Sequence, residues 1–356
     1  MQKKILFICT AQPDYPRNTQ ILKALSSRFQ VIKIVSRRPF YPLRILEVII
    51  RFLLFSPGKD YHLIYAGFLG QPLVTLLKFF KKKPLVLDAF VSVYDCLCLD
   101  RKDFKTASLA GKISYRLDKL SFCLADTIIT DTNANAEFFS ALFKIGREKF
   151  YTLYMGADEN IFYPKEVKRK GGHFIVFFHG TFWPLHGIEY IIKAAKLLEK
   201  EKDIVVRLLG AGREKEKILR LAKNLEIRNV EFINWVSYED LSNQIAEADL
   251  CLGGHFSTAQ KAKRVIAGKT FMYLAMKKPV IAGDNPANRE VFIHAKNIYM
   301  CEMGNALSLA DAILKLKENA DLKDTVAQAG FDLFKELFSN KKTQERLSKI
   351  IADKIE

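Results

Sequence analysis

The chain has 356 residues, of which 49% are hydrophobic and 27% are charged. This balance is ordinary for a folded protein and excludes long disordered stretches. One domain usually holds roughly 100–200 residues, so the length predicts two domains. The formal net charge is +17. Up to residue 165 the chain carries 25 basic and 14 acidic residues, or +11, and the remainder carries 31 minus 25, or +6.

So large an excess of positive charge predicts an anionic partner. The signatures of nucleic-acid-binding motifs are absent, and no interleaving of aromatic and basic residues suggests a surface on which bases stack. We therefore expect a membrane surface or a phosphorylated substrate as the partner, and no nucleic acid.

The cysteines and the N-terminus predict a cytoplasmic protein. Of the six cysteines only Cys96 and Cys98 are close, and their C-x-C spacing has no second pair for a zinc site, so reduced thiols are expected. No small-residue cleavage site follows the short apolar run at the N-terminus. The longest apolar stretch, 45–55, is interrupted by Glu47 and Arg51 and falls short of the ~20 residues of a membrane-spanning helix.

The first half of the chain alternates short apolar runs with helical patterns. Strand, loop, helix and strand follow one another from residue 5 to residue 35, with the helix at 19–29. This order recurs and argues for parallel βαβ units. The expected strands are Ile5–Cys9, Val31–Val35, Leu63–Tyr65, Leu85–Leu87, Thr127–Thr130 and Phe150–Tyr154.

The pattern restarts after a charged, glycine-containing link at 165–172. The expected strands are Phe174–Phe178, Val205–Leu209, Val230–Ile233, Leu250–Leu252 and Pro279–Ala282, and the helices between them are Gly187–Glu199, Arg213–Asn224, Leu241–Glu247 and Thr270–Met276. Helices are expected over the rest, with Phe331–Phe338 and Lys341–Ile355 last. The chain is therefore expected to be α/β, with two Rossmann-like, doubly wound parallel-sheet domains at 1–164 and 165–335 and a terminal helix within 336–356.

Ligands of open parallel sheets bind beyond the C-terminal ends of the strands. Two such domains with these ends facing each other would create one shared cleft. Transferases, epimerases and two-lobed binding proteins all have this architecture, so the fold alone does not choose among them.

Four segments of the chain carry a more specific pattern. They are Met155–Pro164 (MGADENIFYP), Phe178–Ala194 (FHGTFWPLHGIEYIIKA), Leu208–Gly212 (LLGAG) and Arg264–Glu290, which contains GKTFMYLAMKKPVIAGDNPANRE. In order and spacing they resemble glycosyltransferase family 4, a large retaining group with the GT-B fold. The resemblance spans the whole chain. It implies an acceptor-binding domain at 1–164, a nucleotide-sugar-binding domain at 165–335, a cleft between them, and a terminal helix at 336–356 that packs back toward the N-terminal domain.

The glycine-rich loops suit a departing nucleoside diphosphate, whose growing negative charge needs fixed donors and cations. Gly180 and Gly187 let the backbone approach a phosphate, and Gly187 opens a helix. Lys269 adds a charge at a second helix start, although for each glycine a plain tight turn is the alternative. The residues expected around the donor diphosphate are Gly180, Thr181, His186, Gly187, Gly210, Gly212, Arg264, Gly268, Lys269, Thr270 and Asp284.

The chain departs from the family pattern at four positions. Where the family commonly has an Arg and a Lys beside the first two glycines, this chain has Thr181 and His186. Arg264 or Lys269 is expected to supply the missing charge, and capping or packing is the alternative role of His186. The family's two glutamates fall on Arg264 and Met272. Since Met272 cannot bond ribose hydroxyls, we expect a subgroup that holds ribose differently rather than an inactive enzyme.

Acidic residues after the strands are the candidates for catalysis. Asp88 ends an apolar run and is expected near the reacting sugar, and Glu290, after the turn 283–288, is expected to accept hydroxyl bonds. The alternative for Glu290 and Asp284 is a helix-start residue that balances the dipole. Arg17 is expected to hold an acceptor phosphate or, alternatively, to form a surface salt bridge. The acceptor-side candidates are Arg17, Asn18, Ser92, Asp95 and Asp131, with a helix N-cap as the alternative for Asp131.

The resemblance implies transfer with retention at the anomeric carbon, with departure and attack on the same sugar face. No Asp-x-Asp motif occurs, so we expect no metal and no cofactor beyond the nucleotide-diphosphate sugar as co-substrate. By analogy the product is a cell-surface polysaccharide or glycoconjugate. A sugar-nucleotide epimerase, which needs acids and a histidine around the anomeric carbon, and a non-catalytic two-lobed sugar-binding protein are the alternatives.

Two stretches that are both basic and apolar predict peripheral contact with the inner face of a membrane. Arg37, Arg38, Arg44 and Arg51 flank an apolar helix, and 78–83 (KFFKKK) is the second stretch. Each basic residue near an anionic surface contributes ~1 kcal/mol. A lipid-linked acceptor fits this placement, and an ordinary domain face with solvated basic residues is the alternative.

Overall fold

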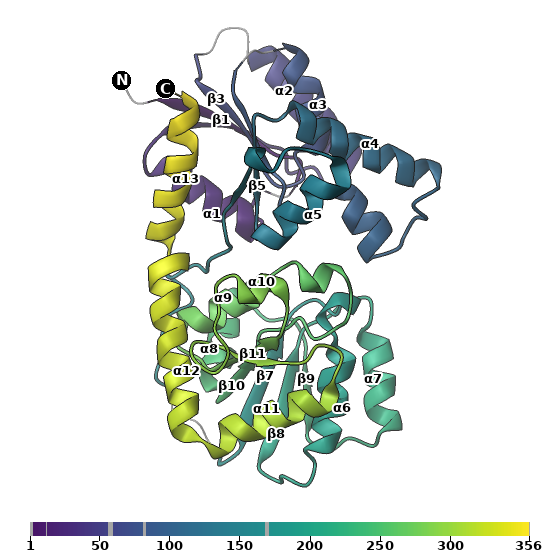
Figure 1. Cartoon of the computed structure of the whole chain (residues 1–356), viewed down its shortest axis with the longest axis vertical. Coiled ribbons are helices and arrows are strands. Elements are labelled where there is room, and N and C mark those ends of the chain that lie inside the picture. The colour runs from purple at the N-terminus through teal and green to yellow at the C-terminus, as the bar shows by residue number, and fades with distance from the viewer. Residues whose placement is uncertain (1–2, 12, 56–59, 81–82, 168–170, 356) are drawn as a thin grey trace. The chain divides into compact units, whose positions relative to one another are not determined.

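Two parallel β-sheets organise the chain, which a computed structural model describes over residues 3–11, 13–55, 60–80, 83–167 and 171–355 (Figure 1). Contacts divide the chain into unit 1, Met1–Met155 with Asn340–Glu356, and unit 2, Gly156–Ser339. The prediction of an α/β chain with two parallel-sheet domains is confirmed.

The unit boundaries differ from the expected ones at 164 and 335. Residues before 164 already pack in unit 2, where the Phe162 ring meets Tyr238 edge-on and Lys165 donates to Ser242. The second expected boundary falls inside η6 (Phe334–Phe338), whose Phe338 packs on Phe271 of unit 2. Unit 2 therefore includes both of these segments.

Unit 1 is a six-stranded sheet in the order β2-β1-β3-β4-β5-β6, parallel throughout. Its strands are β1 (Lys4–Ile8), β2 (Gln30–Ile34), β3 (Leu63–Ala66), β4 (Leu85–Asp88), β5 (Thr127–Thr130) and β6 (Phe150–Thr152). Its helices are α1 (Pro16–Ser26), α2 (Tyr41–Phe55), α3 (Gln71–Phe80), η2 (Asp95–Asp100), α4 (Leu109–Leu124), α5 (Asn133–Phe143), η3 (Arg147–Lys149) and α13 (Asn340–Ile355).

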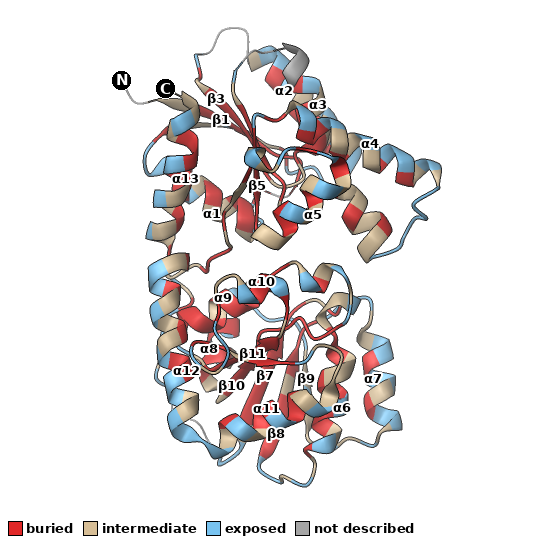
Figure 2. Cartoon of the chain, in the orientation of Figure 1, coloured by how far each residue is buried: buried red, intermediate tan, exposed pale blue. Residues whose placement is uncertain are grey.

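The inner strands β1, β3, β4 and β5 are short, mainly apolar runs because both faces of the sheet are covered there. Along β1, Leu6 and Ile8 belong to one hydrophobic cluster, while Ile5 and Phe7 belong to another. This alternation follows the two-residue period of a strand. Figure 2 shows the buried colour along the strands at the centre of this sheet.

The terminal helix α13 completes one face of the unit 1 sheet. Its side chains Leu347, Ile350 and Ile351 join the cluster formed by β1 and α1. Gln20 of α1 also donates to the Thr343 hydroxyl of α13 at 3.3 Å. Figure 1 shows α13 alongside α1. The last residues of the chain are thus part of the core that the first residues build.

Helix α2 has one buried and one exposed apolar face. Val48 and Phe52 are buried in unit 1. Arg44, which was expected to face a membrane, is buried as well, because its guanidinium donates to the carbonyl oxygens of Thr10 and Arg38. The exposed apolar side chains are Leu43, Leu46, Ile50, Leu53 and Leu54. Within the described ranges no helix is long and apolar enough to cross a bilayer, and the stretch 78–83 lies largely outside the side chains that the structure describes.

Unit 2 is a second six-stranded parallel sheet, in the order β12-β11-β10-β7-β8-β9. Residues 299–301 form a strand where a helix was expected, because Tyr299–Cys301 pairs with the edge of β11. The strands are β7 (Phe174–His179), β8 (Ile204–Leu209), β9 (Val230–Ile233), β10 (Leu250–Leu252), β11 (Val280–Gly283) and β12 (Tyr299–Cys301). The helices are η4 (Pro184–His186), α6 (Ile188–Leu197), α7 (Lys215–Asn224), α8 (Tyr238–Glu247), η5 (Lys261–Lys263), α9 (Gly268–Ala275), α10 (Pro286–Arg289), α11 (Ala306–Glu318), α12 (Ala320–Leu333) and η6.

Candidate functional site

The sheet of unit 2 reverses its strand order beside β7. From β7 the chain continues to β8 and β9 on one side and then crosses to β10 on the other. Such a switch point is the usual ligand position of an open parallel sheet, beyond the C-terminal ends of its strands. The residues that follow β7, β8 and β10 are therefore expected to form a ligand site.

Two glycines allow the loops at this point to touch. Gly210 follows β8 with φ +142°, and a Cβ there would lie 2.0 Å from the carbonyl oxygen of Gly180. Gly187 precedes α6 with φ +68°, and a Cβ there would lie 2.4 Å from the amide nitrogen of Ser257. Only glycine fits at both positions. The two glycines therefore allow the loop after β7 to lie directly against the turn after β8 and the loop after β10.

A buried lysine and two histidines meet beside these glycines. Lys269, at the start of α9, is only 6% exposed. Its Nζ lies 3.2 Å from Nδ1 of His186 and 4.4 Å from the centre of the Phe178 ring. Nδ1 of His186 lies 3.2 Å from Nδ1 of His255, and their rings stack at 5.0 Å between centroids. A Cβ on Gly180 would lie 3.2 Å from Lys269 Nζ, so the amine borders the loop after β7.

Burial weakens the charge of this cluster. It lowers the pKa of Lys269 from 10.5 to about 7. Burial and, secondly, Lys269 hold the pKa values of His186, His255 and the nearby His179 well below 6.5. Among the described residues no carboxylate lies within ion-pair distance of Lys269. A basic cluster with no internal counter-charge is suited to an anionic ligand.

Two helix starts add to the positive potential. The N-caps of α6 and α9 are Gly187 and Ala267, and neither makes a side-chain capping bond. The first amide groups of both helices thus have no capping side chain, and the helix dipole favours an anion there. Thr270, expected to contact the diphosphate, is fully buried, and its hydroxyl donates to the Gly253 carbonyl at 3.5 Å instead.

The other donor-side candidates differ in placement. Thr181 is half-buried in the loop after β7, and Gly212 is exposed at the turn after β8. Arg264 ends η5 and is half-buried, and Met272 is half-buried on α9. The structure brings Lys269, and not Arg264, into hydrogen-bond distance of His186.

Asp284 and Glu290 lie around the short helix α10. The Asp284 carboxylate pairs with Arg289, with its oxygens 2.6 and 2.5 Å from Nε and Nη2. Asn285 is the N-cap, since its side chain accepts from the amide of Asn288. Glu290 follows the end of α10, so its alternative role as a helix-start residue is wrong.

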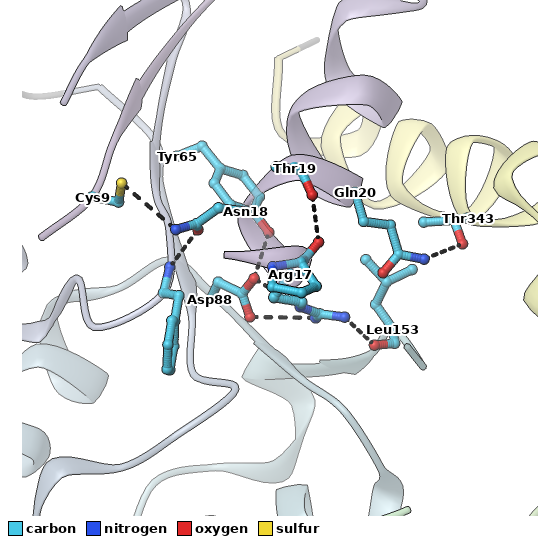
Figure 3. Close-up of polar contacts among 11 residues, drawn as sticks. Cys9, Arg17, Asn18, Thr19, Gln20, Tyr65, Asp88, Leu153 and Thr343 are labelled. Atoms are coloured by element: carbon cyan, nitrogen blue, oxygen red, sulfur yellow. Dashed lines mark hydrogen bonds and ion pairs between the residues drawn. The ribbon is translucent and has the colours of Figure 1, made fainter. Parts of the chain in front are cut away.

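In unit 1, the side chains of Arg17 and Asp88 form an ion pair with each other (Figure 3). Both side chains are fully buried, with Nε of Arg17 3.0 Å from a carboxylate oxygen of Asp88. Arg17 also donates to the Leu153 carbonyl at 2.8 Å, and the Tyr65 hydroxyl donates to Asp88 at 3.4 Å. Burial alone would lower the pKa of Arg17, but the Asp88 carboxylate raises it above its ordinary value. Neither side chain has any exposed surface. Arg17 therefore does not fit the expected contact with a phosphate, and Asp88 does not fit the expected contact with a sugar.

The remaining acceptor-side candidates also serve the fold of unit 1. The Asn18 amide oxygen accepts from the amide of Phe68 at 3.2 Å. Ser92 donates to the buried Asp118 at 2.6 Å and accepts from the amide of Asp95 at 3.0 Å.

Asp131 is not the N-cap of the following helix. It is buried and accepts from the Asn135 side chain at 2.9 Å. The N-cap of α5 is Thr132, whose hydroxyl accepts from the amide of Asn135.

Sequence reasoning missed His255 and His179. His255 lies 69 residues beyond His186 along the chain, and no motif joins them. His179 ends β7 and bonds the hydroxyl of Tyr273 through both its amide and Nδ1. The one available signal was position, because both histidines follow or end strands that flank the switch point. In the described part of the chain no group of three or more His, Cys, Asp or Glu side chains is arranged to hold a metal ion.

Two Rossmann-like sheets, with glycine-rich loops and a basic cluster at one switch point, define a class of two-domain nucleotide-binding proteins. Residues 160–333 match the family described as Glycosyl transferases group 1. The matched residues lie within unit 2, and together with the relatives described next they identify the chain as a glycosyltransferase.

Relatives and solved structures agree with this assignment. The chain is 24% identical over 282 residues to an uncharacterized glycosyltransferase of Methanocaldococcus jannaschii, with 76% of this chain and 68% of that protein covered. It is 25% identical over 169 residues to the lipopolysaccharide core biosynthesis glycosyltransferase LpsD of Rhizobium meliloti, with 47% and 46% covered. The chain spans about half the length of several curated relatives that it matches.

The fold of the whole chain also has solved counterparts. The crystal structure of Anabaena HepE in complex with UDP and glucose is similar with a TM-score of 0.75 at 17% identity, with 99% of this chain and 100% of that chain covered. At this identity the likeness concerns the fold, and it agrees with the expected GT-B class.

Proposed function

We propose that the protein transfers a sugar from a nucleoside-diphosphate sugar to a glycan or lipid-linked acceptor, with retention at the anomeric carbon. The observation that carries the proposal is the buried Lys269 beside Gly180, with no carboxylate among the described residues to neutralise it. A diphosphate supplies the missing charge, and the start of α9 supplies backbone donors. Departure of the nucleoside diphosphate is favoured because its new charge forms next to these groups.

Two relatives support a particular donor and product. The structure of HepE holds UDP and glucose, which supports a uridine nucleotide as the first donor to test. LpsD is named for lipopolysaccharide core biosynthesis, which supports a cell-surface polysaccharide or glycoconjugate as the product. Ribose recognition without the paired glutamates falls to groups other than Met272.

A thermal-shift screen tests the nucleotide. UDP, GDP, ADP and TDP and their common sugar conjugates are added to the full chain. A selective ligand at 100 times its Kd stabilises unit 2 by ~2.7 kcal/mol, and we expect one base to stand out. If none of these compounds raises the melting temperature, the proposed donor site is wrong.

An acceptor assay with the selected donor separates the alternatives. A transferase releases the nucleoside diphosphate only when an acceptor is present, an epimerase converts the donor without one, and a binding protein does neither. The anomeric configuration of the isolated product tests retention.

We propose in addition that the reaction needs no metal ion. The support is the lack of an Asp-x-Asp motif in the sequence. Transfer is expected to continue in the presence of EDTA. Activity that disappears with the chelator and returns with Mn²⁺ would overturn this.

We propose that α2 binds the surface of an anionic membrane, where a lipid-linked acceptor resides. Its exposed side chains Leu46 (52%), Ile50 (46%) and Leu54 (80%) recur at helical spacing on one face. Arg37 and Arg38 lie before the helix with largely exposed side chains. An apolar stripe flanked by arginines is the pattern of a helix that lies in the headgroup region.

Vesicle flotation tests the membrane contact. The wild-type chain is expected to float with phosphatidylglycerol-containing vesicles at low salt and less so at high salt, because the arginines contribute through screened charge. The double variant Leu46→Glu/Ile50→Glu is expected to stay at the bottom. Leu307→Glu, at a 59% exposed leucine on α11 of unit 2, is the matched control and should float. A wild-type chain that never floats would refute the contact.

A further inference from the structure

The basic cluster of unit 2 is built so that its nitrogens cannot all carry protons at once. Nδ1 of His186 lies 3.2 Å from both Nδ1 of His255 and Nζ of Lys269. A nitrogen–nitrogen hydrogen bond needs a proton on one atom and a lone pair on the other. If all three atoms carried protons, both contacts would become repulsive. The arrangement seen here is therefore that of an incompletely protonated cluster.

Bases from several elements surround the cluster. Besides His186 on η4, His255 after β10 and Lys269 on α9, the charge of Lys269 acts on His179 at the end of β7. Lys261, at the start of η5, acts on His255. Tyr273 of α9 faces His179 through a neutral hydroxyl. In the described ranges no carboxylate pairs with Lys269, His186 or His255, so nothing within the cluster stabilises additional protons.

A bound diphosphate changes this balance. Its negative charges favour the protonated form of each nearby base. Protonation of His186 breaks its contact with one neighbour and leaves N–H groups that can donate to phosphate oxygens. In the loop after β7 this chain has the uncharged Thr181 and the titratable His186. The positive charge of His186 therefore depends on a proton taken from solvent.

We propose that this chain binds the diphosphate of its sugar nucleotide together with protons, which are taken up by the cluster of His186, His255 and Lys269. The proposal rests on the proposed function and adds a regulation of the same site. Affinity for the donor therefore depends on pH in the neutral range, and the two histidines act as binding residues whose charge appears with the ligand.

The test is isothermal titration calorimetry of the full chain with UDP-glucose, followed by the other sugar nucleotides of the thermal-shift screen. In a sugar nucleotide both phosphates are diesters and do not titrate near neutral pH, so protons that are exchanged belong to the protein. The binding enthalpy is measured in two buffers with different ionisation enthalpies. We expect uptake of about one proton near pH 7.5, and a loss of affinity of up to about tenfold per pH unit from about pH 7 to about pH 9.

Variants assign the uptake to the cluster. His186→Asn and His255→Asn keep a nitrogen or oxygen near the Nδ1 position but do not titrate. Each is expected to reduce the number of protons taken up and to flatten the pH profile. His294→Asn makes the same change at an exposed histidine of unit 2 and should behave as the wild type. Melting without ligand shows that each variant folds.

The outcomes separate this inference from the proposed function. If no sugar nucleotide binds at any pH, the proposed function fails, and the inference fails with it. If a sugar nucleotide binds with the same affinity at pH 7 and pH 9 and with no dependence on the buffer, the function stands and proton uptake is refuted. This comparison uses the wild-type chain alone, so a variant that does not fold cannot obscure it.

Discussion

At the scale of single residues, the buried Arg17–Asp88 pair is expected to contribute to the stability of unit 1. Asp88→Asn leaves the buried guanidinium of Arg17 without its counter-charge. Removing one partner of a buried ion pair costs about 3–5 kcal/mol, whereas an exposed pair contributes about 0–1 kcal/mol. We therefore expect a loss of that larger size in the free energy of unfolding by urea. Asp14→Asn, which breaks the exposed pair with Arg37, is the control.

The double variant Arg17→Met/Asp88→Asn separates charge from packing. It removes the charge together with its partner, so we expect it to be more stable than Asp88→Asn alone. The single variant Arg17→Met completes the comparison. If the double variant loses as much unfolding free energy as the two single variants together, the pair contributes no coupling energy.

Lys269 makes stability depend on pH. Its folded pKa of about 7 lies below the ordinary 10.5, so the unfolded chain binds more protons between these values. Stability therefore rises with pH across that window and is lost as pH falls toward 7. The difference in unfolding free energy between the wild type and Lys269→Met should change by on the order of 4 kcal/mol from about pH 7 to about pH 10. Denaturant titrations at several pH values measure it, and a constant difference would contradict the lowered pKa.

At the scale of elements, the turn after β8 must contain glycine at residue 210. Gly210→Ala places a Cβ 2.0 Å from the carbonyl oxygen of Gly180, at a φ of +142° that side chains rarely adopt. We expect a loss of about 1–3 kcal/mol in stability and weaker sugar-nucleotide binding, because the loop after β7 has to move. Gly172→Ala, where a Cβ meets no atom within 4 Å, should change neither by more than about 0.5 kcal/mol. Thermal shift with and without ligand compares them, and equal behaviour of the two variants would contradict the close approach.

Strands and helices with a strong pattern could be predicted from the sequence, and contacts between distant segments could not. The runs Thr127–Thr130 and Val230–Ile233 match β5 and β9 residue for residue. β5 is a buried central strand, and β9 is an edge strand whose Glu231 is exposed. The edge strand β12 was missed, because its pairing with β11, and not a pattern of its own, distinguishes it from the helices expected there. The loops of the sequence predicted that the glycines after β7 and β8 and Lys269 lie near one another, and the structure places them together. His255 did not, because its partner is set by the strand order and not by spacing along the chain.

At the scale of the whole molecule, two hydrophobic cores provide two sources of stability. Each of the described hydrophobic clusters lies within one unit. Unit 1 draws on both ends of the chain, whereas the residues of unit 2 are continuous from 156 to 339. A sugar nucleotide bound at the cluster of unit 2 therefore stabilises one core and not the other.

Calorimetric unfolding of α13 variants tests this division. Leu347→Ala and Ile351→Ala each remove a fully buried side chain from the unit 1 core, at a cost of about 2–5 kcal/mol. We expect them to lower the transition of unit 1 and to leave unchanged the transition that a sugar nucleotide raises. Lys349→Ala, at an exposed position of the same helix, should shift neither. If the α13 variants and the ligand both shift a single shared transition, the two cores unfold as one cooperative body, and α13 then stabilises the donor site as well as unit 1.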